Sequence, residues 1–241
     1  MKKEERKRGL SVVIFIIIFI VATFYVGYKY FRVAKIEIQG NKDIETAVII
    51  ANSGIKIDDN LFSISQNKVK NNINANSYLE YFDLKRVYPS KVIIEVYERA
   101  PVAEIVSDNK RFYIDKDVNV LEIVDADQQF YLQIVGLFVK SEKTGQRLSL
   151  ENDYELEAVA DIVGDINFDL IKEHVTLIDL TDVNDIMMKT KQGFVIKFGQ
   201  SDDVGKKAEW IDAVIVKLAE NKIVDGVINV SSGNSATYSK K

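Results

Sequence analysis

Near its start the chain has nineteen consecutive residues without a charge, LSVVIFIIIFIVATFYVGY (10–28). A bilayer hydrocarbon core about 30 Å thick needs about 20 apolar residues in a helix, so this run predicts a transmembrane helix over residues 10–28. A cleaved signal peptide is the alternative, but its apolar core usually has ~7–15 residues and ends in a small-x-small site. No such site follows Thr23, so we expect the segment to be retained as an anchor.

A different pattern begins after this run. Residues 33–41 alternate between apolar and polar positions and end in Gly-Asn, which predicts a half-buried strand and a turn. Apolar residues then recur at helical spacing over 44–51, and Gly54 supplies a stop signal. Ser63 and Gln66 form a capping-box pattern that predicts the start of a second helix.

Residues 81–98 read as two strands joined by a tight turn at Pro89, whose fixed φ suits that position. The apolar residues that alternate around Ile94 are expected to face a core. Pro101 has no N–H for a ladder, so it ends the pairing and separates this region from the remainder of the chain. The order strand, helix, helix, strand, strand predicts a small α+β domain over residues 33–100.

The rest of the chain predicts a mixed, strand-rich β domain over residues 101–232, followed by a flexible polar tail at 233–241. The expected strands are a hairpin at 111–123, a meander at 175–181, 185–190 and 194–199, and a last strand at 226–232. The chain as a whole is therefore expected to have an α+β fold.

Two helices are expected within this second domain. One opens at a capping-box pattern formed by Asn152 and Glu155 and stops at Gly164. The other is amphipathic. Its apolar face has Trp210, Ile211, Val214, Ile215 and Leu218, and its opposite face has Lys207, Lys217 and Glu220.

Charge sets the expected orientation and excludes one class of partner. Residues 1–9 carry five Lys or Arg and two Glu, so the positive-inside rule makes them a cytoplasmic tail. The remaining 27 basic and 34 acidic residues give the extracytoplasmic part a net charge of −7. Nucleic-acid binding needs clustered Lys and Arg, so no nucleic-acid partner is expected.

The sequence offers little catalytic chemistry. It has no cysteine and one histidine, His174, which is expected to be a surface or capping residue. Neither a G-x-S-x-G nor a GxGxxG motif occurs, and no His/Cys cluster could hold zinc. Asp179 in LIDL has two interpretations: a buried functional carboxylate, or a solvent-facing residue of an alternating strand.

Two stretches come close to ligand-binding motifs. DKDVN (115–119) resembles the opening of a calcium loop, but Val120 and Ala126 stand where the loop needs Gly and Glu. GQSDDVGKK (199–207) resembles a phosphate-binding loop, but has five residues between its glycines and Lys207 in place of Ser or Thr. We therefore predict a polar turn and a solvated loop, with no metal and no cofactor.

Several stretches resemble the FtsQ/DivIB family of bacterial division proteins, whose members have a POTRA domain followed by a β domain. The stretches are IEIQGN (36–41), RVYPSKVIIEVYERAPVA (86–103), LIDLTD (177–182), KQGFVIKFG (191–199) and GVINVS (226–231). They occur in the family's order behind a single apolar segment, and together they span nearly the whole chain.

The resemblance implies a non-enzymatic scaffold at the division septum. Its implied partners are FtsL-like and DivIC/FtsB-like bitopic proteins and the septal peptidoglycan synthase complex, in the cytoplasmic membrane. Peptidoglycan contact is left open. A POTRA-bearing transport or assembly component is the runner-up, and an extracellular enzyme is disfavoured because no catalytic constellation is visible.

The resemblance also implies β-augmentation, in which a partner strand adds to an exposed sheet edge. The last strand is the predicted edge. Alternation there places Ile228 and Val230 toward the core and Val227, Asn229 and Ser231 outward. The predicted partner-binding residues are Asn229, Val230, Ser231, Ser232 and Gly233.

Overall fold

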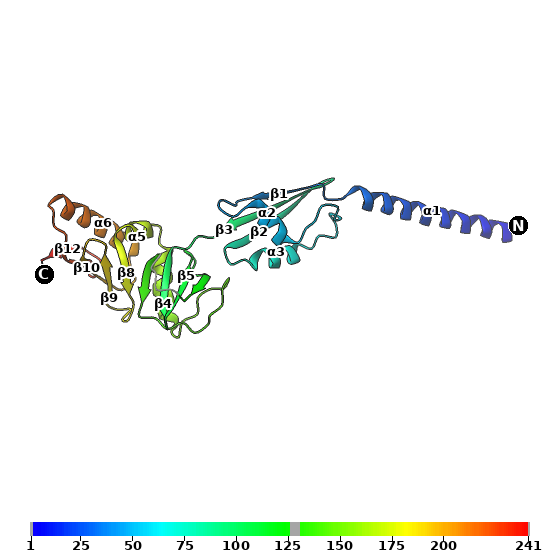
Figure 1. The fold of residues 1–241 in the computed structure, drawn as a ribbon. Helices are drawn as coiled ribbons and strands as arrows, with labels where there is room; N and C mark the ends of the chain where they lie inside the picture. Colours follow the sequence, from blue (N-terminus) through cyan, green and yellow to red (C-terminus); the bar gives the residue numbers. More distant parts are fainter. Residues whose placement is uncertain (1, 126–130, 241) are drawn as a thin grey trace. The chain divides into compact units, whose positions relative to one another are not determined.

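The structure is a computed structural model that describes the backbone of residues 2–125 and 131–240, with side chains from residue 13 onward. The chain divides into two compact units, Met1–Glu98 and Arg99–Lys241 (Figure 1). Each unit has its own cluster of buried apolar side chains.

The first unit begins with helix α1 (Lys2–Tyr30). Its stretch Val13–Tyr30 has a mean hydropathy of 2.0, is not buried against the rest of the protein, and is long and apolar enough to cross a membrane. The helix extends past both ends of the predicted 10–28 span. On the N-terminal side this follows from the Lys, Glu and Arg residues, which are good helix formers.

The remainder of the first unit is a three-stranded sheet with two helices. Strand β1 pairs parallel with β3, and β2 pairs antiparallel with β3, which gives the order β1-β3-β2. This confirms the predicted α+β succession of strand, helix, helix, strand and strand. The elements are β1 (Lys35–Gln39), α2 (Thr46–Ser53), α3 (Gln66–Asn74), β2 (Leu79–Val87) and β3 (Lys91–Glu98).

Local sequence explains the ends of these elements. Gly54 ends α2 in the left-handed conformation at φ +72, which glycine adopts without a Cβ penalty. Helix α3 begins after Ser65, whose Oγ accepts a hydrogen bond from the Lys68 amide. The cap is therefore Ser65 and not the predicted Ser63, because the Ser63 hydroxyl donates to the Asn60 carbonyl instead.

The alternation predicted in β3 is confirmed. Val92, Ile94 and Val96 are buried in the core of this unit, while Tyr97 is exposed. At the far end of β3, the Glu98 carboxylate accepts hydrogen bonds from the amides of Lys42 and its two successors. This contact joins the turn after β1 to the end of β3.

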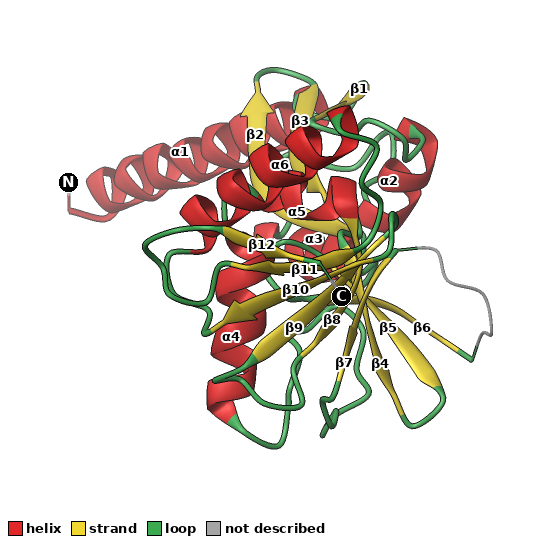
Figure 2. Ribbon diagram, turned by 90° about the vertical axis from the view of Figure 1, so that its left-hand side faces the viewer, coloured by secondary structure: helices red, strands yellow, loops and turns green. Residues whose placement is uncertain are grey.

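The second unit is built on one twisted, nine-stranded mixed sheet (Figure 2). The strand order is β12-β11-β10-β9-β8-β7-β4-β5-β6. Pairs β4–β7, β7–β8 and β10–β11 are parallel and the other pairs are antiparallel. The strands are β4 (Ala103–Ser107), β5 (Lys110–Ile114), β6 (Val120–Val124), β7 (Leu132–Val135), β8 (Val175–Asp179), β9 (Ile186–Thr190), β10 (Phe194–Gly199), β11 (Gly226–Asn229) and β12 (Thr237–Ser239).

Three helices pack into the core of this unit, where two were predicted: α4 (Asp153–Gly164), α5 (Phe168–His174) and α6 (Val204–Glu220). The unpredicted helix is α5. It has only seven residues, too few for helical periodicity to be visible in sequence. Phe168 and Ile171 lie one turn apart and are both buried, so tertiary packing stabilises this short helix.

Helix α6 presents its predicted apolar face to the core, with Ile211, Ile215 and Leu218 buried. Lys207 was expected on the opposite, solvent-facing side. In the structure its side chain is completely buried. That expectation was wrong, because the loop before the helix folds back and supplies polar partners for the ammonium group.

Candidate functional site

The end of the chain forms the terminal edge of the nine-stranded sheet. The predicted last strand, 226–232, is not that edge. Strand β11 ends at Asn229 and lies between β10 and β12. The tail at 233–241 was expected to be flexible, but Thr237–Ser239 form β12 and pair antiparallel with β11.

Tyr238 explains why the polar tail returns to the sheet. Its ring packs edge-on against Phe194, with centroids 6.5 Å apart, and its hydroxyl donates to the Asp225 carbonyl at 3.1 Å. A single aromatic residue thus supplies both an apolar contact and a hydrogen bond. One aromatic in a polar segment has no periodicity, so the sequence did not reveal this strand.

The residues predicted to bind a partner lie at the end of β11, where Asn229 is its last residue, and in the turn that follows it. Asn229 Oδ1 accepts hydrogen bonds from the amide and the hydroxyl of Ser231. The Gly233 amide donates to the Val230 carbonyl at 3.1 Å, and the Gly233 carbonyl accepts from Lys206 Nζ, also at 3.1 Å. Val230 is fully buried, as the alternation predicted.

The hydrogen-bond register shows which residue faces the open edge. The Val230 amide donates to the carbonyl of Lys197 in β10. Successive N–H groups in a strand point to opposite sides, so the amides of Val227 and Asn229 face β12. Their cross-strand neighbours in β12 are Ser239 and Thr237, which therefore face β11. The N–H and C=O of Tyr238, between them, point to the outer side.

The two ends of the sheet differ. At β6, the Val120 amide donates to the Gln146 carbonyl, and the Val120 carbonyl accepts from the Gly145 amide. A loop therefore covers part of that edge. At β12, no strand of the described chain pairs with the outer side. An open strand of this kind is a template for another chain.

The edge strand β1 of the smaller sheet carries paired charges. The Glu37 carboxylate lies 2.8 Å from Lys91 Nζ and 3.3 Å from Lys35 Nζ. The hydrogen bond from Lys91, assisted by Gln39 and Lys35, lowers the pKa of Glu37 to about 2. Charged side chains on an edge strand disfavour pairing with another strand, so β1 is a poorer docking edge than β12.

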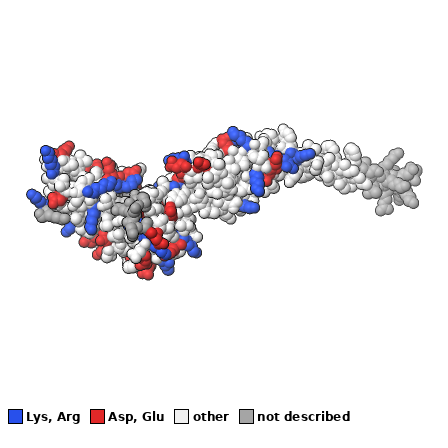
Figure 3. Space-filling model, in the orientation of Figure 1, with Lys and Arg blue, Asp and Glu red and all other residues white. Residues whose placement is uncertain are grey.

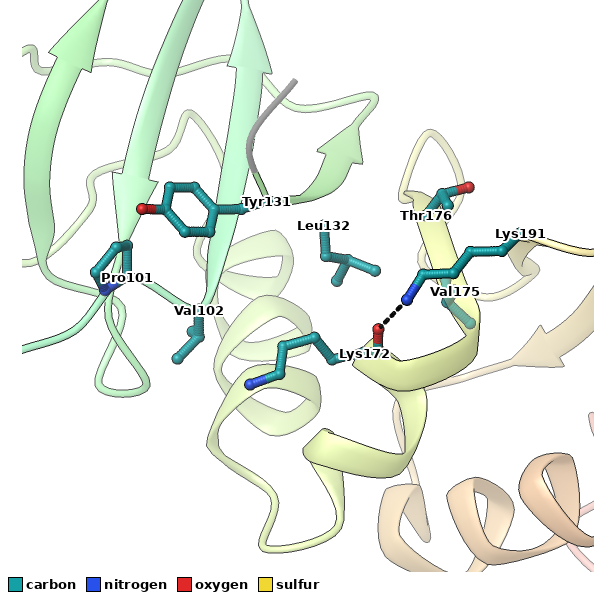
Figure 4. A pocket seen from close by; sticks show the side chains of 8 residues that line it. All are labelled: Pro101, Val102, Tyr131, Leu132, Lys172, Val175, Thr176 and Lys191. Atoms are coloured by element: carbon teal, nitrogen blue, oxygen red, sulfur yellow. Dashed lines mark hydrogen bonds between the residues drawn. The ribbon is translucent and has the colours of Figure 1, made fainter. Parts of the chain in front are cut away.

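A cavity of about 520 Å³ lies in the second unit, between the start of β4 and the C-terminal end of α5 (Figure 4). The Lys191 ammonium donates to the Lys172 and Glu173 carbonyls at the end of α5. The lining consists of Pro101, Val102, Tyr131, Leu132, Lys172, Val175, Thr176 and Lys191. None of these is a carboxylate, histidine or thiol; the polar groups of the lining are those of Tyr131, Thr176 and the two lysines.

The residues that resembled ligand-binding motifs are satisfied within the protein. The Asp115 carboxylate accepts hydrogen bonds from the Asp117 and Asn119 amides, which closes a polar turn; Ala126 lies outside the described residues. Asp202, in the loop that resembled a phosphate-binding loop, pairs with Lys207 at 2.5 Å. Among the described residues, no group of three or more His, Asp or Glu could hold a metal ion.

The two other candidate residues also have partners. His174 was expected at the surface or as a cap, but it is buried at the end of α5 and its Nε2 lies 2.8 Å from Asp212 Oδ1 of α6. This pair joins the two helices. Asp179 is half-buried at the end of β8 and accepts hydrogen bonds from the Thr181 amide and hydroxyl.

Charges of both signs are interspersed over the visible face of the two units (Figure 3). No extended basic surface is visible on this face. The described part of α1 is almost free of charged side chains in this view.

A single apolar N-terminal helix, a β-α-α-β-β unit and a large mixed sheet define a class: POTRA-containing proteins with one candidate membrane span. Residues 31–99 match the family described as "POTRA domain, FtsQ-type", and residues 100–231 match "FtsQ/DivIB, C-terminal related". The chain belongs to the FtsQ/DivIB family of cell-division proteins.

Similar proteins in other bacteria are named as cell division proteins. The cell division protein DivIB of Clostridium tetani is 27% identical over 228 residues, which cover 93% of this chain and 86% of that protein. DivIB of Clostridium botulinum is 27% identical over 242 residues, covering 100% and 94%. The extracytoplasmic domain of Geobacillus stearothermophilus DivIB aligns with a TM-score of 0.34 and 13% identity, over 52% of this chain and 97% of that domain.

Proposed function

We propose that this protein is a non-enzymatic scaffold of bacterial cell division. Helix α1 anchors it in the cytoplasmic membrane with the N-terminus inside the cell, and the rest of the first unit and the whole second unit lie outside. At the division septum it binds bitopic partners of the FtsL and DivIC/FtsB kind, and through them supports and regulates septal peptidoglycan synthesis. The family membership and the division names of the relatives support this role.

The observation that carries the proposal is the open edge of β12. A partner strand that adds there gains backbone hydrogen bonds from the Tyr238 N–H and C=O. Thr237 and Ser239 are exposed, so their side chains are free to contribute to specificity. The predicted residues Asn229–Gly233 support this edge, because they form the end of β11 and the start of the turn that leads to β12.

The runner-up function is a POTRA-bearing component that delivers unfolded chains to a transport machine. A pull-down of the full-length protein from membranes separates the two functions. Co-purification of small bitopic proteins of the FtsL and DivIC kind supports the division scaffold. Co-purification of a secretion or outer-barrel machine without them contradicts it.

Two substitutions at one position test the docking edge. Tyr238→Ala removes the ring but keeps the amide, whereas Tyr238→Pro removes both. A proline takes away one ladder hydrogen bond and places a ring where the partner's strand must lie. We expect the affinity of full-length protein for the DivIC-like partner to fall about tenfold or more from the alanine to the proline variant.

The comparison is made only between variants that are equally folded and keep β12 paired with β11, judged by slow hydrogen exchange of the Val227 and Asn229 amides. Because the Tyr238 amide points away from β11, both should have the same melting temperature. Equal partner affinity in the two variants, with equal melting temperatures, would rule out β12 as the docking strand.

A further inference from the structure

Four aromatic side chains gather where α1 meets the small sheet. We call Tyr30, Phe31, Phe62 and Tyr88 the aromatic cluster. They come from three segments: the end of α1, the loop before α3, and the turn between β2 and β3. Phe31 is the centre, with its ring centroid 5.5 Å from Tyr30, 5.2 Å from Phe62 and 5.7 Å from Tyr88, all edge-on.

Hydrogen bonds hold this cluster to the end of the helix. Asn60 Nδ2 donates to the Tyr28 carbonyl in the last turn of α1 at 2.7 Å. The Leu61 amide donates to the Phe31 carbonyl at 3.0 Å, and Arg86 Nε donates to the Leu61 carbonyl at 2.9 Å. The loop that carries Phe62 is therefore tied to both α1 and β2.

The rings contact one another but are poorly shielded from solvent. Tyr30, Phe62 and Tyr88 are 65%, 61% and 55% exposed. Ring-to-ring contacts of this kind add only a modest stabilisation, while the exposed faces keep an unfavourable apolar contact with water. A contiguous group of exposed aromatic rings marks a surface that is covered in use.

The length of α1 places this group at a particular depth. The uncharged run 10–28 has nineteen residues, which rise about 28 Å in a helix. That nearly equals the ~30 Å hydrocarbon core of a bilayer. Tyr30 and Phe31 then fall at the boundary between acyl chains and headgroups, where aromatic residues are enriched. Lys29 and Arg32 flank them, and their long side chains can extend to the polar headgroup level.

We propose that the aromatic cluster inserts into the outer interface of the cytoplasmic membrane, with Phe62 and Tyr88 in contact with lipid. Continuity with α1 argues for lipid as the occupant, because the rings begin where the apolar helix ends. The cluster would seat the POTRA unit directly on the bilayer. This inference rests on the proposed anchor, and the experiment distinguishes failure of the lipid contact from failure of the anchor.

The test measures tryptophan fluorescence in lipid vesicles. The chain has one tryptophan, Trp210, so Trp210→Phe gives a dark full-length background. Into it are placed, one at a time, Phe62→Trp in the cluster, Phe19→Trp in the middle of the apolar run, and Phe82→Trp as the matched control. Phe82 is also exposed, at 75%, on β2. It lies five residues from the β2 end next to Tyr88, roughly 16 Å along the strand.

Each variant is reconstituted in vesicles that contain lipids brominated either near the headgroup or near the chain terminus. We expect the tryptophan at 62 to lose several-fold more emission than the one at 82, and to be quenched best by the shallow bromines. The tryptophan at 19 should be quenched best by the deep bromines.

The possible outcomes distinguish lipid contact of the cluster from membrane insertion of α1. Quenching at 19 together with equally weak quenching at 62 and 82 would overturn the lipid contact while leaving the anchor intact. Absence of quenching at 19 would remove the anchor and, with it, this inference. Unchanged circular dichroism of all three variants is required for either conclusion.

Discussion

At the scale of single residues, the ammonium group of Lys207 is fully buried. It donates to Asp202 Oδ1 at 2.5 Å and to the Gln200 carbonyl at 2.9 Å, and it lies 4.8 Å from the centroid of the Phe198 ring. Lys207 is fully buried, whereas the Asp202 side chain is 62% exposed. The pair is therefore asymmetric: removing the carboxylate leaves a buried charge, while removing the lysine leaves a carboxylate that water can solvate.

We expect Asp202→Asn to lower the free energy of unfolding by about 2 kcal/mol and Lys207→Met by less, about 1 kcal/mol. Urea unfolding of the two variants and the parent protein measures the difference. A larger loss in the methionine variant would show that the lysine contributes more through its carbonyl and ring contacts than through its charge.

The same pair predicts a pH dependence. The hydrogen bond from Lys207 lowers the pKa of Asp202 below its ordinary value of 3.8. A carboxyl whose folded pKa is depressed stabilises the protein above its unfolded pKa, and that contribution is lost as pH falls through the folded value. The stability difference between the parent protein and Asp202→Asn should therefore be constant near neutral pH and shrink below about pH 4. A difference that persists unchanged at lower pH would contradict this origin.

At the scale of elements, the decisive feature is a strand of three residues. Strand β12 satisfies the outward amides of β11 and covers part of Phe194, and in doing so it moves the open edge of the sheet from β11 to itself. Sequence alternation identified the two faces of β11 correctly but could not tell on which side another strand lay.

Removing residues 234–241 should expose β11 as the new edge. Because Val227 and Asn229 direct their amides toward β12, their hydrogen exchange should become much faster. The Ile228 and Val230 amides point to β10 and should stay protected. NMR-detected exchange measures each amide separately. Equal acceleration of all four would mean that the whole edge unfolds and that the register does not explain protection.

At the scale of the whole molecule, two compact units divide at Glu98–Arg99, each with its own apolar core. We propose that each unit folds independently, the first close to the predicted boundaries at 33–100 and the second from about residue 101 through β12, beyond the predicted end at 232. A fragment of residues 30–98 would keep the contacts of Phe31 and Val33 with the loop before α3.

The substitution Ile94→Asp tests this independence in the full chain. It places a charge in the core of the first unit, where Ile94 is fully buried. The cost of several kcal/mol is comparable with the whole stability of a small domain. NMR signals of the first unit should collapse while those of residues 99–240 keep their positions. Tyr97→Asp, on the exposed face of the same strand, is the control and should leave both units folded. Loss of both sets of signals in the isoleucine variant would show a single cooperative unit.

Local patterns in the sequence determined much of this protein. The uncharged run 10–28, the alternation in 91–98 and the apolar stripe of α6 each depend on residues within a few positions of one another. Periodicity reports such relations directly. The long apolar helix, the succession of elements in the small unit and the inward direction of Ile94, Ile228 and Val230 could therefore be predicted from the sequence alone.

Tertiary structure alone decided the candidate site. Which edge of the sheet is open depends on pairing between β11 and a segment beyond a turn, and Tyr238 finds its partner Phe194 more than forty positions away. The burial of Lys207 depends on the path of the loop before α6, and the aromatic cluster on three segments that meet in space. A short strand, a single charged residue and a lone ring have no period to detect. Their roles arise from non-local contacts, which local sequence patterns do not encode.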